Sequence, residues 1–275
     1  SFVMDYFKKV MESHGKPYLI IQLDDHSSSV GYETRAEAAI RSFRNHFNAG
    51  RKCSSPADAS EDKLLKKRHS LDKTLIFPNW DHLSLRLVVA NLRRAGIDAR
   101  LLEETPAGIQ KSLRYNTGQC LPLNIIAQEF IDYVRTHNLD PEQTVLWMAN
   151  SQIACNINLY PYHIKGIFNA YGRGMQKANV YVGGTSLADI SLKLPIDTYF
   201  AYMFGGFLRK IGCRLRPYEK IKGTTDKVIQ RSLDILADAF SGNRSKTDAL
   251  VEVVSLFEKI EIAETAGAVL RPKVA

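Results

Sequence analysis

The sequence predicts an α/β protein that contains doubly wound parallel-sheet lobes and a helical C-terminal region. Between about residues 71 and 184, short apolar runs alternate with amphipathic helical patterns. This alternation is typical of parallel β-sheet joined by right-handed crossovers. After Gly184 the strand signals weaken and long helical patterns follow. The 275 residues, 45% of them hydrophobic, are enough to form a substantial core.

The first segment, residues 1–47, reads as the strand–helix end of an upstream lobe. PYLIIQLD (17–24) predicts a strand, and TRAEAAIRSFRNHF predicts an amphipathic helix that starts near Thr34. Thr34 and Glu37 fit a capping box. Residues 48–70 lose hydrophobic periodicity and gather Ser, Ala, Asp, Gly and Lys, so we interpret them as a linker or mobile loop.

The α/β lobe spans residues 71–184 and holds four predicted strands with helices between them. The helix LSLRLVVANLRRAG closes at Gly96, and the helix LPLNIIAQEFIDYVRTHN starts near Cys120 with Pro122 at an early position. A further helix extends to about Met175. The predicted strands are TLIFP (74–78), DARLLE (98–103), TVLWMA (144–149) and NVYVG (179–183).

The C-terminal region, residues 185–275, is predicted to be mainly helical. Three amphipathic patterns carry this prediction, and no repeat of solenoid type accompanies them. They are IDTYFAYMFGGFLRKIG (196–212), TDKVIQRSLDILADAFSG (225–242) and KTDALVEVVSLFEKIEIAETAG (246–267).

Composition and charge indicate which cellular compartment and which classes of partner to expect. No apolar run approaches the roughly 20 residues needed to span a bilayer, and the first residues lack the order of a signal peptide, so we expect a cytoplasmic protein without a membrane partner. The net charge of +8 comes from Lys and Arg scattered along the chain. No RNP-like motif or zinc-finger spacing accompanies them, which disfavours nucleic acid as the partner. The opening SFVMDYFKKV reads as the middle of a domain, which indicates a piece of a longer polypeptide.

The four cysteines, Cys53, Cys120, Cys155 and Cys213, are too far apart to indicate a disulfide framework. Cys53 falls in the predicted linker. Cys120 and Cys155 fall at strand–helix junctions, where open α/β sheets bind ligands. A helix amino terminus there favours a thiolate or an anionic iron–sulfur cluster. The alternative is that these cysteines are small buried hydrophobes, because no C-x-x-C pattern joins them.

Other polar residues are candidates for a pocket near these junctions. Each also has a structural interpretation: a helix cap, turn chemistry, aromatic packing or an ion pair between Arg216 and Glu219. No dinucleotide, Walker, G-x-S-x-G or H-E-x-x-H motif occurs. The candidates are His26, Asp81, His82, Tyr160, His163, Arg216 and Glu219.

Several segments together resemble one protein family. LDDHSSSVGYETRAEAAIRSF (23–43) resembles the LDEHS…G…TR-EAF signature of acyl-CoA dehydratase activase-related proteins. Those proteins are similar to 2-hydroxyglutaryl-CoA dehydratase components and to double-cubane cluster proteins. Around the three later cysteines, YNTGQCLPLN resembles that family's SGKECYP segment, ANSQIACNINLYPYH its GPCRFGQY segment, and IGCRLRPYEKIKGTTD its C-x-x-RPYE…G-x-T-D segment.

The resemblance implies flavodoxin-like halves that bind a [4Fe–4S] cluster, or half of a double-cubane cluster, through Cys120, Cys155 and Cys213. It implies an electron-accepting component of an ATP-dependent reductase or a 2-hydroxyacyl-CoA dehydratase-like system. An ATP-hydrolysing activase, separate or fused upstream, would supply the electrons. An acyl-CoA or another small molecule would be the substrate, and we expect a homo-oligomer.

The sequence also departs from the family pattern. SGKECYP is replaced by NTGQCLP, and the Arg and Gln of GPCRFGQY are absent from IACNINLY. Two alternatives therefore stay open: a non-catalytic structural or interaction lobe that has lost the cluster, and a zinc site formed by the same thiolates with His82 or His163.

Overall fold

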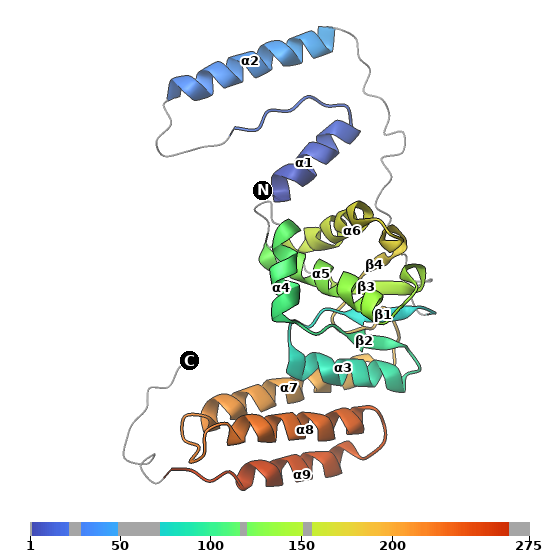
Figure 1. Cartoon of the computed structure of the whole chain (residues 1–275), viewed down its shortest axis with the longest axis vertical. Helices are drawn as coiled ribbons and strands as arrows, with labels where there is room; N and C mark the ends of the chain where they lie inside the picture. Colours follow the sequence, from blue (N-terminus) through green and yellow to red (C-terminus); the bar gives the residue numbers. More distant parts are fainter. Residues whose placement is uncertain (1, 22–28, 49–71, 116–119, 151–155, 264–275) are drawn as a thin grey trace.

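The computed structural model describes residues 2–21, 29–48, 72–115, 120–150 and 156–263 (Figure 1). Within these ranges it is an α/β structure with one four-stranded sheet, whose strand order is β2-β1-β3-β4 and whose neighbours are all parallel. The α/β class and the parallel sheet predicted from the sequence are thereby confirmed. The strands are β1 (Thr74–Phe77), β2 (Ala99–Leu101), β3 (Thr144–Ala149) and β4 (Asn179–Gly183).

The sheet is buried on both faces, which explains why its strands are continuous apolar runs. Alternate residues belong to two separate cores: Phe77 and Trp147 to one, Ile76 and Leu146 to the other. Helices α5 (Leu121–Thr136) and α6 (Tyr160–Tyr171) complete the second core, with α4 (Pro106–Ser112) beside α5. The first core is completed by α3 (His82–Arg94), α7 (Pro195–Leu215), α8 (Thr224–Phe240) and α9 (Lys246–Glu258).

Most helix ends in the lobe follow the predicted signals. Gly96 follows the last residues of α3 with φ of 81°, a conformation that glycine adopts without strain. Pro122 lies in the first turn of α5, as predicted. The sequence reading missed α4, which has only 7 residues and begins where the Thr105 hydroxyl accepts a hydrogen bond from the Gly108 N–H.

The amino-terminal segment differs from its prediction. It contains α1 (Phe2–Ser13) and α2 (Ser29–Asn48). The predicted strand 17–24 is wrong over residues 17–21, which pair with no described strand, and residues 22–24 lie outside the described ranges. An apolar run becomes a strand only where a neighbour takes its backbone hydrogen bonds.

The capping box predicted at Thr34 is also wrong, because α2 starts at Ser29. The Thr34 hydroxyl donates to the Val30 carbonyl inside the helix, at 2.9 Å, and therefore caps nothing. Beyond Asn48, the predicted linker lies outside the described residues.

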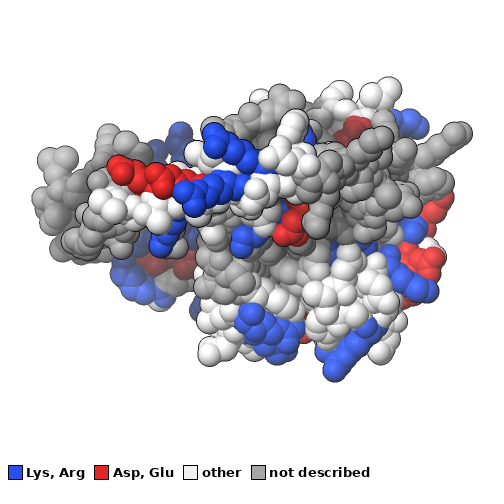
Figure 2. Space-filling model, turned by 90° about the horizontal axis from the view of Figure 1, so that it is seen from above, with Lys and Arg blue, Asp and Glu red and all other residues white. Residues whose placement is uncertain are grey.

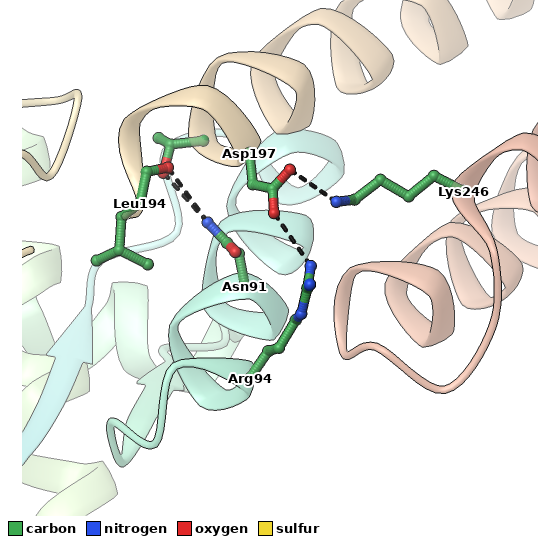
Figure 3. Close-up of polar contacts among 6 residues, drawn as sticks. Asn91, Arg94, Leu194, Asp197 and Lys246 are labelled. Carbon is green, nitrogen blue, oxygen red and sulfur yellow. Dashed lines mark hydrogen bonds and ion pairs between the residues drawn. The ribbon is translucent and has the colours of Figure 1, made fainter. Parts of the chain in front are cut away.

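Helix α7 lies against α3 and runs in the opposite direction. At one end Arg94 of α3 pairs with Asp197 of α7 at 3.1 Å, and Lys246 reaches the same carboxylate at 2.6 Å (Figure 3). Asn91 adds hydrogen bonds to the Leu194 carbonyl and the Thr198 hydroxyl. At the other end Asp81, before α3, pairs with Arg209 of α7.

The antiparallel arrangement of α3 and α7 determines where the C-terminal end of α7 lies. Helix α3 starts at the carboxyl end of β1 and runs back along the sheet. Because α7 runs opposite to α3, its last turns return to the carboxyl ends of the strands. Among the described helices, none is both long and apolar enough to cross a membrane.

Candidate functional site

The carboxyl end of β1 leads into Asn79, Trp80, Asp81 and His82, so two predicted pocket residues lie at the edge where α/β proteins bind ligands. Asp81 occupies the N-cap position of α3 without a side-chain capping bond, and it pairs with Arg209. The side-chain amide of Asn79 lies 3.3 Å from the Nδ1 atom of His82. Asp81 therefore joins α3 to α7, and His82 stays exposed at the edge.

A group of aromatic and polar side chains follows at the ends of β3 and β4. Trp147 stacks on Phe77 with ring centroids 4.9 Å apart. The exposed ring of Trp80 lies with its centroid 5.7 Å from that of Trp147. The Trp147 Nε1 atom is buried without a hydrogen-bond partner, as is Oδ1 of Asp189. The other Asp189 oxygen accepts a 2.5 Å hydrogen bond from the Tyr181 hydroxyl.

Gly183 allows these groups to approach one another. A Cβ atom at this position would lie closer than 3.0 Å to Trp147, Asp189 and Tyr181. Burial, together with Asp189, raises the pKa of the Tyr181 hydroxyl well above its usual value, so the hydroxyl keeps its proton. The sequence reading missed this polar group because Trp147 and Tyr181 belong to strands that read as wholly apolar.

Cys120 lies at the mouth of α5, as predicted. It occupies the N-cap position, makes no side-chain capping bond, and is half-buried against the core beneath α5. The positive end of the α5 dipole favours negative charge at this place, although Pro122 has no N–H and the Leu123 N–H is bonded to the Cys120 carbonyl at 3.2 Å. The surroundings of Cys120 thus fit both a thiolate ligand and a packed thiol.

Cys213 lies in the last turns of α7 and is exposed. It follows Arg209 by one helical turn, and Arg209 contacts Asp81 at the carboxyl edge of the sheet. Cys213 and Cys120 therefore belong to the same end of the lobe, although they come from helices on opposite faces of the sheet. Neither forms a disulfide.

Two of the predicted site residues, Cys155 and His26, lie outside the described residues. Within the described ranges, no group of three or more His, Cys, Asp or Glu side chains is arranged to hold a metal ion. The three-cysteine set predicted from the sequence stays a prediction.

The predicted pair of Arg216 and Glu219 is wrong. The Arg216 guanidinium donates to Asp226 at 2.7 Å, while the two oxygens of Glu219 accept the backbone N–H groups of Gly223 and Thr225, each at 2.7 Å. Asp226, Gly223 and Thr225 all belong to the start of α8, so the RPYEKIKGTTD segment folds as a connection that caps this helix. The pKa of Arg216 is raised first by Asp226 and further by nearby Cys213.

We predict that Glu219→Gln lowers the thermal midpoint at neutral pH. The pKa of Glu219 is lowered to about 2, first by the Thr225 hydroxyl and then by the N–H groups of Thr225 and Gly223. A lowered folded pKa means that this stabilisation is present above the ordinary value of 4.5 and is lost as pH falls toward 2. Thermal unfolding at several pH values should show that the difference in thermal midpoint between variant and wild type becomes smaller as the pH is lowered. Glu142→Gln, at an exposed ion pair with Lys177, is the control. A gap that stays constant with pH would contradict this assignment.

The remaining candidates lie in α6. Tyr160, its first residue, is 6% exposed and packs in the core between α5, α6 and the sheet. His163 is half-buried in the same helical turn. The ring of Tyr160 thus has a packing role, which was the structural interpretation of this aromatic group.

The chain was compared with models of protein families, with curated proteins and with solved structures, and none of the three comparisons found a match.

Proposed function

We propose that this chain is an iron–sulfur-cluster-binding, electron-accepting component of an ATP-dependent reductase or 2-hydroxyacyl-CoA dehydratase-like system, built from doubly wound, flavodoxin-like lobes. The observation that carries the proposal is the direction of α7. It brings Cys213 to the end of the lobe where Cys120 precedes α5, although the two cysteines are 93 positions apart in the sequence. In the sequence, Cys155 comes after β3, and the carboxyl end of β3 lies at this same edge of the sheet.

The chemistry of the two described thiols fits an anionic cluster. Cys120 has the positive end of the α5 dipole beside it, and Cys213 has the Arg216 guanidinium beside it. Cys120, Cys155 and Cys213 would hold one cubane, which supplies a one-electron carrier when bound. Three protein ligands would leave one iron open to a small molecule, such as the acyl-CoA that the resemblance implies.

The charge pattern supports a local anion site better than a nucleic-acid track on the face shown in Figure 2. There, Lys and Arg lie in separate groups with Asp, Glu and uncharged residues between them. Short basic groups suit the phosphates of a CoA ligand or an acidic redox partner such as the activase.

The alternative is a non-catalytic interaction lobe, and the packing of Cys120 against the core beneath α5 favours it. Anaerobic purification with metal analysis separates the two functions. We expect brown protein with about four irons per chain. Cys120→Ala and Cys213→Ala should each lose iron, while Cys53→Ala should keep it. Colourless, iron-free protein after anaerobic reconstitution would overturn the proposal, and bound zinc would support the zinc alternative instead.

A further inference from the structure

A cavity beyond the outer edge of β2 is lined by neither Cys120 nor Cys213. It is a groove of about 880 Å³ between α3 on one side and α4 and α5 on the other. Its volume falls in the range of small-molecule sites. Its walls include Arg86 and Arg93 of α3, Lys111 of α4, and Glu129, Asp132 and Tyr133 of α5.

Glu129 is the unusual group in this groove. Its side chain lines the cavity although the residue is only 8% exposed, and its Oε1 atom is buried without a hydrogen-bond partner. Burial, and secondarily the neighbouring carboxylate of Glu104, raises its pKa to about 7. A buried carboxylate oxygen without a partner is costly, and the carboxylate is stabilised when a cation is brought to it.

Among the described residues, the Lys and Arg side chains that line the groove do not supply that cation. Lys111, the basic residue on the same wall, pairs with Asp132 at 3.1 Å. On the opposite wall, Arg86 pairs with Asp234 at 2.6 Å, and the Nε atom of Arg93 donates to the Ala99 carbonyl at 2.7 Å. Lys111, Arg86 and Arg93 are therefore each bound to a partner other than Glu129.

The bond from Arg93 also indicates which kind of ligand fits. Ala99 belongs to β2, whose outer edge faces the groove, and its carbonyl is already occupied. An added peptide strand would need that carbonyl, so the edge is protected against strand pairing. The groove therefore suits a small molecule.

We propose that this groove binds a small primary amine or diamine, whose ammonium group donates hydrogen bonds to Glu129. Asp132, one turn further along α5, is already paired with Lys111, so Glu129 is left as the contact for the ammonium group. The Tyr133 ring, which stacks on His137 at 4.0 Å, offers an aromatic surface to the alkyl chain. The ligand is an organic cation because, among the described residues, no three carboxylate, thiol or imidazole groups converge as a metal requires.

Calorimetric titration of the 275-residue chain with pentane-1,5-diamine at low ionic strength and about pH 8 tests the proposal. We expect saturable binding that Glu129→Gln weakens about tenfold or more, because the variant keeps the shape and loses the charge. Glu142→Gln, an exposed carboxylate outside the groove, should bind within about twofold of wild type. Pentane-1,5-diol, the uncharged analogue, should not bind.

The outcomes are separable from those of the cluster experiment. Cys213→Ala, whose side chain is outside the groove, should bind the diamine as wild type does. Equal affinity of wild type and Glu129→Gln would overturn the proposal, as would the absence of diamine binding or binding of the diol. Thermal unfolding of Glu129→Gln identifies any loss of binding that comes from misfolding.

Discussion

Gly205→Ala is expected to destabilise the lobe by about 3 kcal/mol. Gly205 is buried in α7 where this helix crosses α3. A Cβ atom there would lie closer than 3.0 Å to the Oγ, Cα and N atoms of Ser84. Two of these three atoms are backbone, so a change of rotamer cannot relieve the clash. The helices would have to separate, and the contacts between them would weaken.

The adjacent residue provides a matched control. A Cβ atom at Gly206 would have no neighbour within 4 Å. Gly206→Ala should therefore stabilise α7 by up to about 1 kcal/mol, because alanine has the higher helix propensity. Urea denaturation of both variants measures the opposite shifts. A shift in the same direction for both would show that α7 does not lie against α3 as described.

The sequence was sufficient to predict the α/β lobe because its signals are local. β1, β3 and β4 are apolar runs, since helices cover both faces of the sheet, and Gly96 and Pro122 mark helix ends through their own backbone preferences. The predicted strand at 17–21 failed for a non-local reason: its residues have strand-like preferences but no neighbouring strand.

The candidate site was less predictable because its contacts join distant residues. The positions of Asp81 and Cys120 follow from the ends of local elements, yet the partner of Asp81 is Arg209, 128 residues away. Arg216 and Glu219 are close in sequence, but the start of α8 provides better partners for each.

Glu129 was missed for a different reason. It lies in an amphipathic pattern where a glutamate is ordinarily exposed, but in the folded chain α4 packs beside α5 and Glu129 is buried. No local signal in the sequence distinguishes a buried glutamate from an exposed one.

Glu129→Gln is expected to raise the free energy of unfolding by about 2 kcal/mol at about pH 8 and to change it little at about pH 5. The pKa of Glu129 is about 7 in the folded chain, against an ordinary value of 4.5. Between these values the folded state holds a proton that the unfolded state has released, so stability falls as pH rises through this window. Above it, the folded chain carries a buried charge, and the glutamine variant avoids that cost.

The charges around Glu129 support this direction. Glu104 is acidic, while Lys111 is tied to Asp132 by the ion pair at 3.1 Å. The expected effect is smaller than the full pKa difference implies, because the groove admits solvent that screens the charge. Urea denaturation at both pH values, with Glu142→Gln as control, measures this change in the free energy of unfolding.

Glu219 affects stability over a separate pH range, since its stabilisation is lost only as pH falls from 4.5 toward 2. A stability gain for Glu129→Gln that is equal at both pH values would mean that the carboxyl is not the group that titrates. If the gain grows with pH, the same buried charge that lowers stability is the one available to an amine ligand.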